Sequence, residues 1–230
     1  MERKTYVIIT ASGQKSFIDI DGKPILRRIM EIFTGAVPGI RVVTVLPRDY
    51  IRGWKDYCLS SGFDVPQEIS EGGITRFHSV RAALSKVPDG AIVAIHDGLR
   101  PLVSKELVSR MFSLMDDGRR AVIPVVGSDD SFKSLRLVKF EDGSERFEGD
   151  PQPLPDKSRI WTAQTPQLFI AEDIREAYAQ AYDTAFTDDA SVAARKGIPL
   201  TWTRGERYNL RITAPEDVAL ARLVISSPLR

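Results

Sequence analysis

The sequence predicts an α/β fold with a mainly parallel sheet and a projecting β-hairpin arm. Apolar, β-branched runs typical of buried strands alternate with stretches of helical length over roughly the first two-thirds of the chain. This alternation favours a parallel sheet covered by helices on both faces. After residue 133 the alternation stops, and a turn signal between two short extended runs predicts a hairpin.

The alternating part predicts four strands and four helices. The strands are expected at residues 6–10, 41–46, 91–95 and 121–126, and the helices at residues 24–34, 49–61, 75–87 and 104–116. Thr75 and Ser104 stand where an N-cap hydroxyl begins a helix. The part after the hairpin returns to the same pattern, with strands expected at 160–164 and 200–203 and helices at 171–184, 188–196 and 215–225. Thr213 is the expected N-cap of the last helix, with Pro215 near its first turn.

The hairpin segment offers two interpretations. Residues 135–140 and 145–148 flank a turn at 141–144, and a segment with three prolines follows at 149–155. A hairpin with so little apolar content does not stabilise itself, so it is either a surface insertion or an arm that packs on a second subunit. We favour the arm, because apolar side chains such as Leu137 and Phe140 need burial. Residues 1–230 are therefore expected to form a single domain, with 134–157 as a dimerisation arm.

Composition excludes several classes of protein. The net charge is +1 over 230 residues, 43% of them hydrophobic and 27% charged, which predicts no broad nucleic-acid-binding surface. No apolar run reaches membrane-spanning length and no apolar leader is present, so we expect a soluble cytoplasmic protein. Cys58 is the single cysteine, and the two histidines cannot form a histidine-rich metal site.

The first predicted strand leads into a turn of small residues, which is where α/β proteins hold nucleotide phosphates. Ala11, Ser12 and Gly13 allow the backbone to approach a ligand closely. Lys15 follows so soon that a phosphate loop has no room. Either the protein lacks this loop or residues are missing, and we expect a break in the chain near Gly13 and Gln14.

Two further loops lie where strands are expected to end. Gly72 and Gly73 precede a helix on which Arg76 and Ser79 share one face, although a glycine turn before a capped helix explains the same pattern. The second loop places His96, Asp97 and Arg100 in one tight turn directly after a strand. We interpret this turn as a ligand site, with an ion pair that fixes the loop as the alternative.

Three polar segments complete the candidate site. Residues 161–169 interleave hydroxyl and amide side chains with apolar ones, and Lys157 stands just upstream, although an ordinary strand and turn explains the same residues. Residues 187–191 resemble a capped helix start, and residues 205–213 offer Arg211 as an anion ligand. Taken singly, the last two segments are explained by helix capping alone.

Together these segments resemble the 2-C-methyl-D-erythritol 4-phosphate cytidylyltransferases of the non-mevalonate isoprenoid pathway. The matching motifs occur in the family's order: Lys15 in Gln-Lys-Ser-Phe, Gly72-Gly73 with Arg76 and Ser79-Val80, His96-Asp97 with Arg100-Pro101, Asp130-Ser131-Phe132-Lys133, Trp161 with Gln164-Thr165-Pro166-Gln167, Thr187-Asp188-Asp189-Ala190-Ser191, and Asn209 with Arg211-Ile212-Thr213. The resemblance implies a Rossmann-like nucleotidyltransferase fold and a homodimer formed by exchange of the arm.

The sequence also departs from the family pattern. The first loop lacks its glycine-rich stretch with an arginine, and Ile74 replaces an acid. Gly98 and Leu99 stand where the family has alanines, and Ser131 replaces a threonine. Lys157 stands where the family has an arginine, and Arg211 stands where it has a lysine. Both exchanges keep the charge but change the geometry of the contacts.

The resemblance implies a role for each candidate residue. Lys15 would stabilise the triphosphate of CTP, and Lys157 and Arg211 would hold the attacking phosphate. The cytidine cradle would comprise Ala11, Ser12, Gly13, Gly72, Gly73, Arg76 and Ser79. The alditol contacts, some made across the dimer, would come from Asp97, Arg100, Ser131, Thr165 and Thr187.

The implied reaction joins CTP to 2-C-methyl-D-erythritol 4-phosphate and releases pyrophosphate, with Mg²⁺ held largely by phosphates and water and no dedicated protein metal site. Two alternatives stay open. One is a cytidylyltransferase for another alditol phosphate, such as ribitol 5-phosphate. The other is a non-catalytic nucleotide-binding relative, which the short first loop suggests.

Overall fold

The computed structural model describes residues 3–11, 13–150 and 156–227, and its centre is one eight-stranded sheet with the order β10-β7-β11-β6-β1-β4-β5 and β12 beside β7. The strands of this sheet are β1 (Thr5–Thr10), β4 (Arg41–Leu46), β5 (Gln67–Glu71), β6 (Ile92–Asp97), β7 (Ala121–Gly127), β10 (Trp161–Ala163), β11 (Gln167–Ile170) and β12 (Thr201–Arg204). β1 is parallel to both of its neighbours, β4 and β6, so the carboxyl ends of these three strands meet at one edge.

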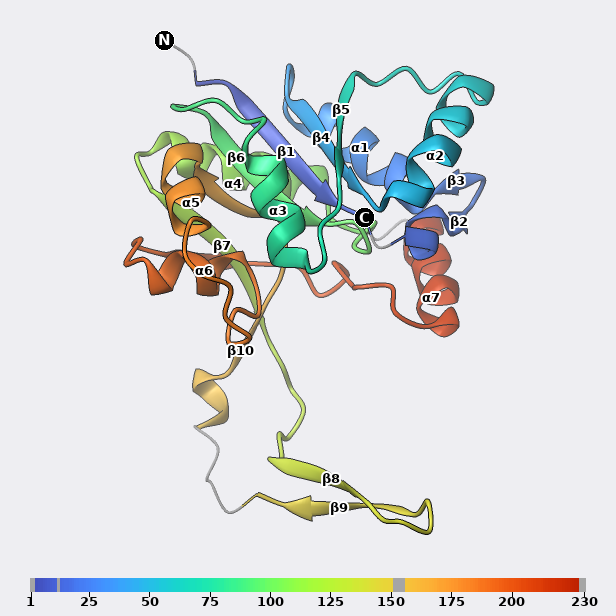
Figure 1. The fold of residues 1–230 in the computed structure, drawn as a ribbon, viewed down its shortest axis with the longest axis vertical. Helices are drawn as coiled ribbons and strands as arrows, with labels where there is room; N and C mark the ends of the chain where they lie inside the picture. Colours follow the sequence, from blue (N-terminus) through green and yellow to red (C-terminus); the bar gives the residue numbers. More distant parts are fainter. Residues whose placement is uncertain (1–2, 12, 151–155, 228–230) are drawn as a thin grey trace.

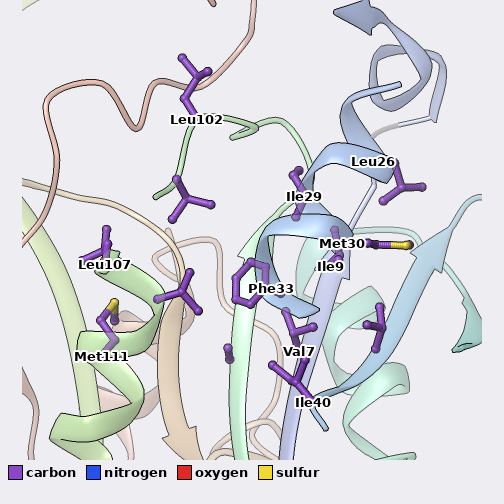
Figure 2. Close-up of a cluster of buried hydrophobic side chains, with 14 of the residues drawn as sticks. Val7, Ile9, Leu26, Ile29, Met30, Phe33, Ile40, Leu102, Leu107 and Met111 are labelled. Atoms are coloured by element: carbon purple, nitrogen blue, oxygen red, sulfur yellow. The ribbon is translucent and has the colours of Figure 1, made fainter. Parts of the chain in front are cut away.

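Helices cover both faces of the sheet (Figure 1). They are α1 (Ile25–Ala36), α2 (Arg48–Ser60), α3 (Arg76–Leu84), α4 (Lys105–Asp116), α5 (Ala171–Ala177), α6 (Asp189–Arg195) and α7 (Pro215–Ser226). The side chains of β1 alternate between the two faces. Val7 and Ile9 join a cluster with α1 and α4 that includes Phe33 (Figure 2), and Ile8 joins a second cluster with α3, α5 and α6. The predicted two-sided α/β fold is confirmed.

Two strands of the main sheet were not expected from the sequence. β5 is an edge strand with mostly polar, partly exposed side chains, so it lacks the apolar run of a central strand. β11 lies antiparallel between β6 and β7, in a sheet that is otherwise mainly parallel. Its four buried residues follow directly on the polar block at 161–167, which hides the start of the strand in the sequence.

Helix starts and ends follow the sequence signals with two exceptions. The hydroxyls of Thr75 and Ser104 accept hydrogen bonds from the backbone as N-caps, as predicted. Thr213 is not the cap of α7, because Ala214 holds that position and the Asp217 carboxylate accepts the N–H groups of both Thr213 and Ala214. The helix expected at 171–184 ends at Ala177, beyond which the chain forms turns and loop.

The expected break near Gly13 and Gln14 is wrong. Residues Gly13–Phe17 form a continuous 3₁₀ helix, η1, and the Ile18 N–H donates to the Lys15 carbonyl. Gly13 has a φ of 60°, and a Cβ there would lie 3.2 Å from the Tyr50 ring. The short turn is therefore a folded feature of this sequence, followed by the small ribbon β2 (Asp19–Ile20) and β3 (Lys23–Pro24).

The predicted hairpin is confirmed as β8 (Leu135–Lys139) and β9 (Glu145–Gly149), which form a separate two-stranded sheet. It projects from the body of the molecule, at the bottom of Figure 1. The short 3₁₀ helix η2 (Lys157–Arg159) follows it in the chain, and part of the proline-rich segment, residues 151–155, lies outside the described residues. Several large apolar side chains of the arm are exposed: Leu135, Leu137, Phe140 and Phe147.

Candidate functional site

A cleft of about 290 Å³ opens at the edge where the carboxyl ends of β1, β4 and β6 meet. Parallel α/β sheets bind their ligands at this position. The cleft is lined by Thr10, Ala11, Val45, Pro47, Gly72, Gly73, Ile74, Thr75, Arg76, Ser79, Asp97 and Arg211. It therefore brings together Ala11 of the small-residue turn, the paired glycines and three of the predicted charged residues, Arg76, Asp97 and Arg211.

The glycine side of the cleft is built from backbone. The N–H of Gly72 donates to the Leu46 carbonyl at 2.8 Å, and the N–H of Gly73 donates to the Ser79 hydroxyl at 3.0 Å. A Cβ on Gly73 would lie 2.6 Å from the Cβ of His78, so only glycine fits there. Ile74 is 97% exposed beside these glycines, at the position of the expected acid. This wall presents backbone groups and no carboxylate to a flat ligand.

Arg76 is fixed by an acid that the sequence analysis had assigned to helix capping. Asp189 is fully buried at the start of α6 and accepts Nη1 and Nη2 of Arg76 at 2.9 and 2.5 Å. The Tyr178 hydroxyl donates to the same carboxylate at 2.6 Å, and burial raises the pKa of that hydroxyl. Burial of the guanidinium lowers the pKa of Arg76, but the ion pair with Asp189 raises it by more. Arg76 therefore stays charged at the cleft wall.

The opposite wall holds Asp97 and Arg211, and Arg100 follows Asp97 in the same turn. Arg211 Nε donates to Asp97 Oδ2 at 2.6 Å, and the Leu99 N–H donates to Oδ1 at 3.0 Å. Arg100 does not line the cleft; its Nη1 donates to the Asn209 carbonyl at 2.6 Å. Burial lowers the pKa of Arg100, and no carboxylate of the described residues forms an ion pair with it. Asp97 therefore pairs with Arg211 and not with Arg100, and this side of the cleft keeps an excess of positive charge.

Gly98 explains one departure from the family pattern. Its N–H donates to the Thr10 carbonyl at 2.9 Å, and a Cβ at this position would lie 2.6 Å from that oxygen. The turn after β6 therefore packs directly on the end of β1 and leaves no room for an alanine.

His96 is fully buried beneath this turn. Because a carbonyl only accepts, His96 Nε2 donates to the Arg100 carbonyl, 3.1 Å away, and Nδ1 accepts the Thr165 hydroxyl at 3.2 Å. The same Thr165 oxygen accepts the Asp97 N–H at 3.0 Å. Burial lowers the pKa of His96 to about 4, so the ring is neutral at pH 7.

Several predicted residues lie outside this cleft. Lys15 donates to the Thr213 carbonyl at 3.0 Å and lines a separate apolar hollow between η1 and α7. Lys157, in η2, donates to the Asp129 carbonyl, and Ser131 is exposed in the segment that leads to the arm. Thr187 lines a small pocket behind Arg76, and Ser12 lies outside the described residues.

Within the described part of the chain, no group of three histidine, cysteine, aspartate or glutamate side chains could hold a metal ion. Asp97 is the single carboxylate among the cleft-lining residues. No described helix has the length and apolar character needed to cross a membrane.

A backbone wall of glycines, small residues at the end of β1 and clustered arginines at the carboxyl edge of a mainly parallel sheet define a Rossmann-like nucleotidyltransferase. A family model described as 2-C-methyl-D-erythritol 4-phosphate cytidylyltransferase matches residues 8–227, and the chain belongs to this family.

Individual relatives agree with this assignment. A 2-C-methyl-D-erythritol 4-phosphate cytidylyltransferase of Bacteroides fragilis is 38% identical over 211 residues, covering 92% of this chain and 90% of the relative. One from Porphyromonas gingivalis is 37% identical and covers 99% of this chain and all of the relative. The fold also matches the crystal structure of the Thermus thermophilus 2-C-methyl-D-erythritol 4-phosphate cytidylyltransferase, with a TM-score of 0.70, 26% identity and coverage of 96% of this chain and 98% of that one.

Proposed function

We propose that this protein joins CTP to 2-C-methyl-D-erythritol 4-phosphate, giving the cytidine diphosphate alditol and pyrophosphate in isoprenoid precursor synthesis. Family membership supports the reaction class. The observation that carries the proposal for this chain is the cleft itself, which sets a glycine wall opposite the Asp97–Arg211 pair across a space of about 290 Å³. A flat base fits against the glycines, and an anion fits beside the arginines.

The reaction forms a bond between an oxygen of the alditol phosphate and the α-phosphorus of CTP while the bond to pyrophosphate breaks. Such transfers depend on positioning and on neutralising the charge that develops on the phosphoryl oxygens. We expect Arg211 to bind the attacking phosphate, which its position in the cleft beside Asp97 supports, and Arg76 to contribute a fixed positive charge on the other wall. Asp97 orients Arg211 and is available to the hydroxyl groups of the alditol.

Mg²⁺ is the proposed cofactor, and the donor set of the cleft fits an ion held mainly by its substrate. One carboxylate, Asp97, lines the cleft, and Mg²⁺ in nucleotide sites retains waters and binds phosphate oxygens. When bound, the ion neutralises charge on the triphosphate and on the leaving pyrophosphate. Arg76 and Arg211 act alongside it on the phosphoryl oxygens.

We further propose a homodimer in which the arm of one subunit reaches the cleft of its partner. Two observations support it. The arm exposes apolar side chains, and a hollow of about 600 Å³ at its base is lined by Val125, Arg159, Trp161, Ala163, Trp202, Thr203 and Arg204. Trp161 and Trp202 are both more than half exposed in the single chain. Lys157 and Ser131 lie away from the cleft of their own chain, so we expect them to act in the partner's cleft. A cytoplasmic location stays a prediction.

The direct test is incubation of the purified protein with CTP, Mg²⁺ and a panel of alditol phosphates, with pyrophosphate release as the measurement. The proposal expects rapid release with 2-C-methyl-D-erythritol 4-phosphate. Faster release with ribitol 5-phosphate would favour the alternative substrate. Binding of CTP without release for any member of the panel would instead indicate a non-catalytic relative.

A further inference from the structure

The polar side chains of residues 164–167 are buried, although the sequence suggested that they bind a ligand. Gln164 and Gln167 are 4% and 1% exposed, and neither lines the cleft. Each amide has both its donor and its acceptor bonded, and each bonds a different part of the chain.

Gln164 holds the loop that presents Arg211. Its Nε2 donates to the Glu206 carbonyl at 2.8 Å, and its Oε1 accepts the Glu206 N–H at 3.1 Å. This amide therefore pairs with the backbone as a neighbouring strand would. Gly205 leaves room for the contact, because a Cβ there would overlap Gln164 Oε1. Asn209, further along the same loop, donates to the Thr165 carbonyl at 2.8 Å.

Gln167 holds the beginning of α6. Its Nε2 donates to Asp188 Oδ2 at 2.8 Å, and its Oε1 accepts the Ala190 N–H at 2.7 Å. Asp189 lies between these two contacts and directs its carboxylate to Arg76. The position of the Arg76 guanidinium at the cleft wall thus depends on the same helix start.

We propose that Gln164 and Gln167 are positioning residues for opposite walls of the cleft: Gln164 places Arg211 through loop 205–211, and Gln167 places Arg76 through Asp189. The inference rests on the proposed function for its kinetic consequences. One four-residue segment then sets the spacing between the wall that binds the nucleotide and the wall that binds the alditol phosphate.

The test replaces each amide by a carboxylate of the same shape. Gln164→Glu sets a carboxylate against the Glu206 carbonyl, and Gln167→Glu sets one against Asp188, so each loses its donated bond and gains repulsion. We expect Gln164→Glu to raise KM for the alditol phosphate about tenfold or more while KM for CTP stays within about twofold. Gln167→Glu should do the reverse.

Two further variants separate positioning from a general loss of stability. Gln180→Glu is the matched control, because Gln180 also donates to backbone carbonyls, those of Ala177 and Val192, and Val192 lies on α6 beyond the helix start that Gln167 bonds. It should lower the melting temperature and leave both KM values unchanged. The double variant Gln167→Glu with Asp188→Asn restores the hydrogen bond in the reverse direction, because the amide at position 188 now donates to the carboxylate at position 167. KM for CTP should then return toward the wild-type value.

Hydrogen exchange gives a readout that does not depend on activity. Gln164→Glu should speed exchange in residues 205–211, and Gln167→Glu should speed it in residues 188–195, each with little effect on the other segment. If both variants lower turnover with unchanged KM values and uniform exchange, as a structural role would require, the inference is wrong. If the wild type transfers no cytidylyl group, the proposed function fails, and the exchange pattern alone decides the positioning roles.

Discussion

The cleft and the hairpin arm both contain ion pairs, but the pairs differ in burial. At the cleft, Asp189 is fully buried and Arg76 reaches it from the cleft wall. In the arm, Arg136 and Glu148 pair with 76% and 34% of their side chains exposed. Exposed pairs contribute roughly 0–1 kcal/mol, whereas removing one partner of a buried pair costs about 3–5 kcal/mol. The ion pair that fixes Arg76 at the cleft wall is therefore strong within one chain, and the pairs of the arm are weak.

The arm has a defined local shape but no core of its own. Its turn is closed by the Phe140 N–H, which donates to the Ser144 carbonyl at 2.9 Å, and by Asp142, whose carboxylate accepts the Ser144 N–H. Leu137 faces Phe147 across the two strands, and both side chains are exposed. The cleft is organised by interior bonds of its own chain, whereas the arm leaves its large apolar side chains exposed.

The largest expected effect is on the cleft side. Arg211→Ala should lower turnover by about 30- to 1000-fold, or about 2–4 kcal/mol of barrier, because the phosphate contact strengthens in the transition state. CTP affinity, measured separately by calorimetry, should change far less. Wild-type turnover, or a loss confined to CTP affinity, would remove Arg211 from the site.

Lys157→Ala should lower turnover over the same range of about 30- to 1000-fold, although Lys157 lies far from the cleft of its own chain. The reason is that we expect this ammonium to bind the attacking phosphate in the partner's cleft. Lys157→Arg should largely keep activity, because the family pattern has an arginine there. Steady-state kinetics with a purified dimer checks both, and an active Lys157→Ala variant would assign this residue to loop structure only.

A third expectation concerns pH and the buried turn under the cleft. His96 has a pKa of about 4 in the folded protein against 6.5 as its ordinary value, so the unfolded state binds a proton first as pH falls. The contribution of His96 to the free energy of unfolding is fully present above pH 6.5. It decreases as the pH falls to about 4, by about 3 kcal/mol in total. Urea unfolding of the wild type and of His96→Gln between pH 4 and pH 6.5 measures this contribution. The free energy of unfolding should fall more steeply with decreasing pH in the wild type than in the variant. The same pH dependence in both proteins would contradict the expectation.

The smallest effect is expected on the arm. Phe147→Ser should weaken the dimer about tenfold and leave the unfolding of the chain's core nearly unchanged, because Phe147 is 71% exposed within one chain. Leu223→Ser, a change at a similarly exposed apolar side chain of α7, is the matched control and should leave the dimer intact. Sedimentation velocity measures both. A wild type that is strictly monomeric at micromolar concentration would contradict the proposed interface.

Most of the fold could be predicted from the sequence, because a parallel strand that is buried on both faces appears as a short run of apolar residues. The interval 41–46 was identified to the residue as β4, and the hairpin followed from its turn signal. β11 could not be predicted, since its direction and its place between β6 and β7 depend on pairing with distant strands. The expected chain break was wrong because Gly13 packs on Tyr50, a contact that the local sequence does not reveal.

The sequence predicted several of the residues that line the cleft, but not the ion pairs and hydrogen bonds that join distant residues around it. The glycine wall and Asp97 lie in the cleft as their place after predicted strands suggested. Asp189 resembles an ordinary acid at a helix start, and its ion pair with Arg76 joins residues 113 positions apart. Gln164 and Gln167 stand in a motif that was noted as polar, but spacing alone does not distinguish a ligand contact from an internal bond.

The measurement that tests the central claim most directly is complementation between two inactive variants. Arg211→Ala and Lys157→Ala are purified separately, mixed under conditions that exchange subunits, and assayed with CTP and 2-C-methyl-D-erythritol 4-phosphate. If each working cleft takes Arg211 from one chain and Lys157 from the other, half of the dimers regain one of two sites, and activity returns to about one quarter of wild type. Activity that stays at the level of the separate variants after confirmed exchange would contradict the claim that the arm completes the partner's cleft.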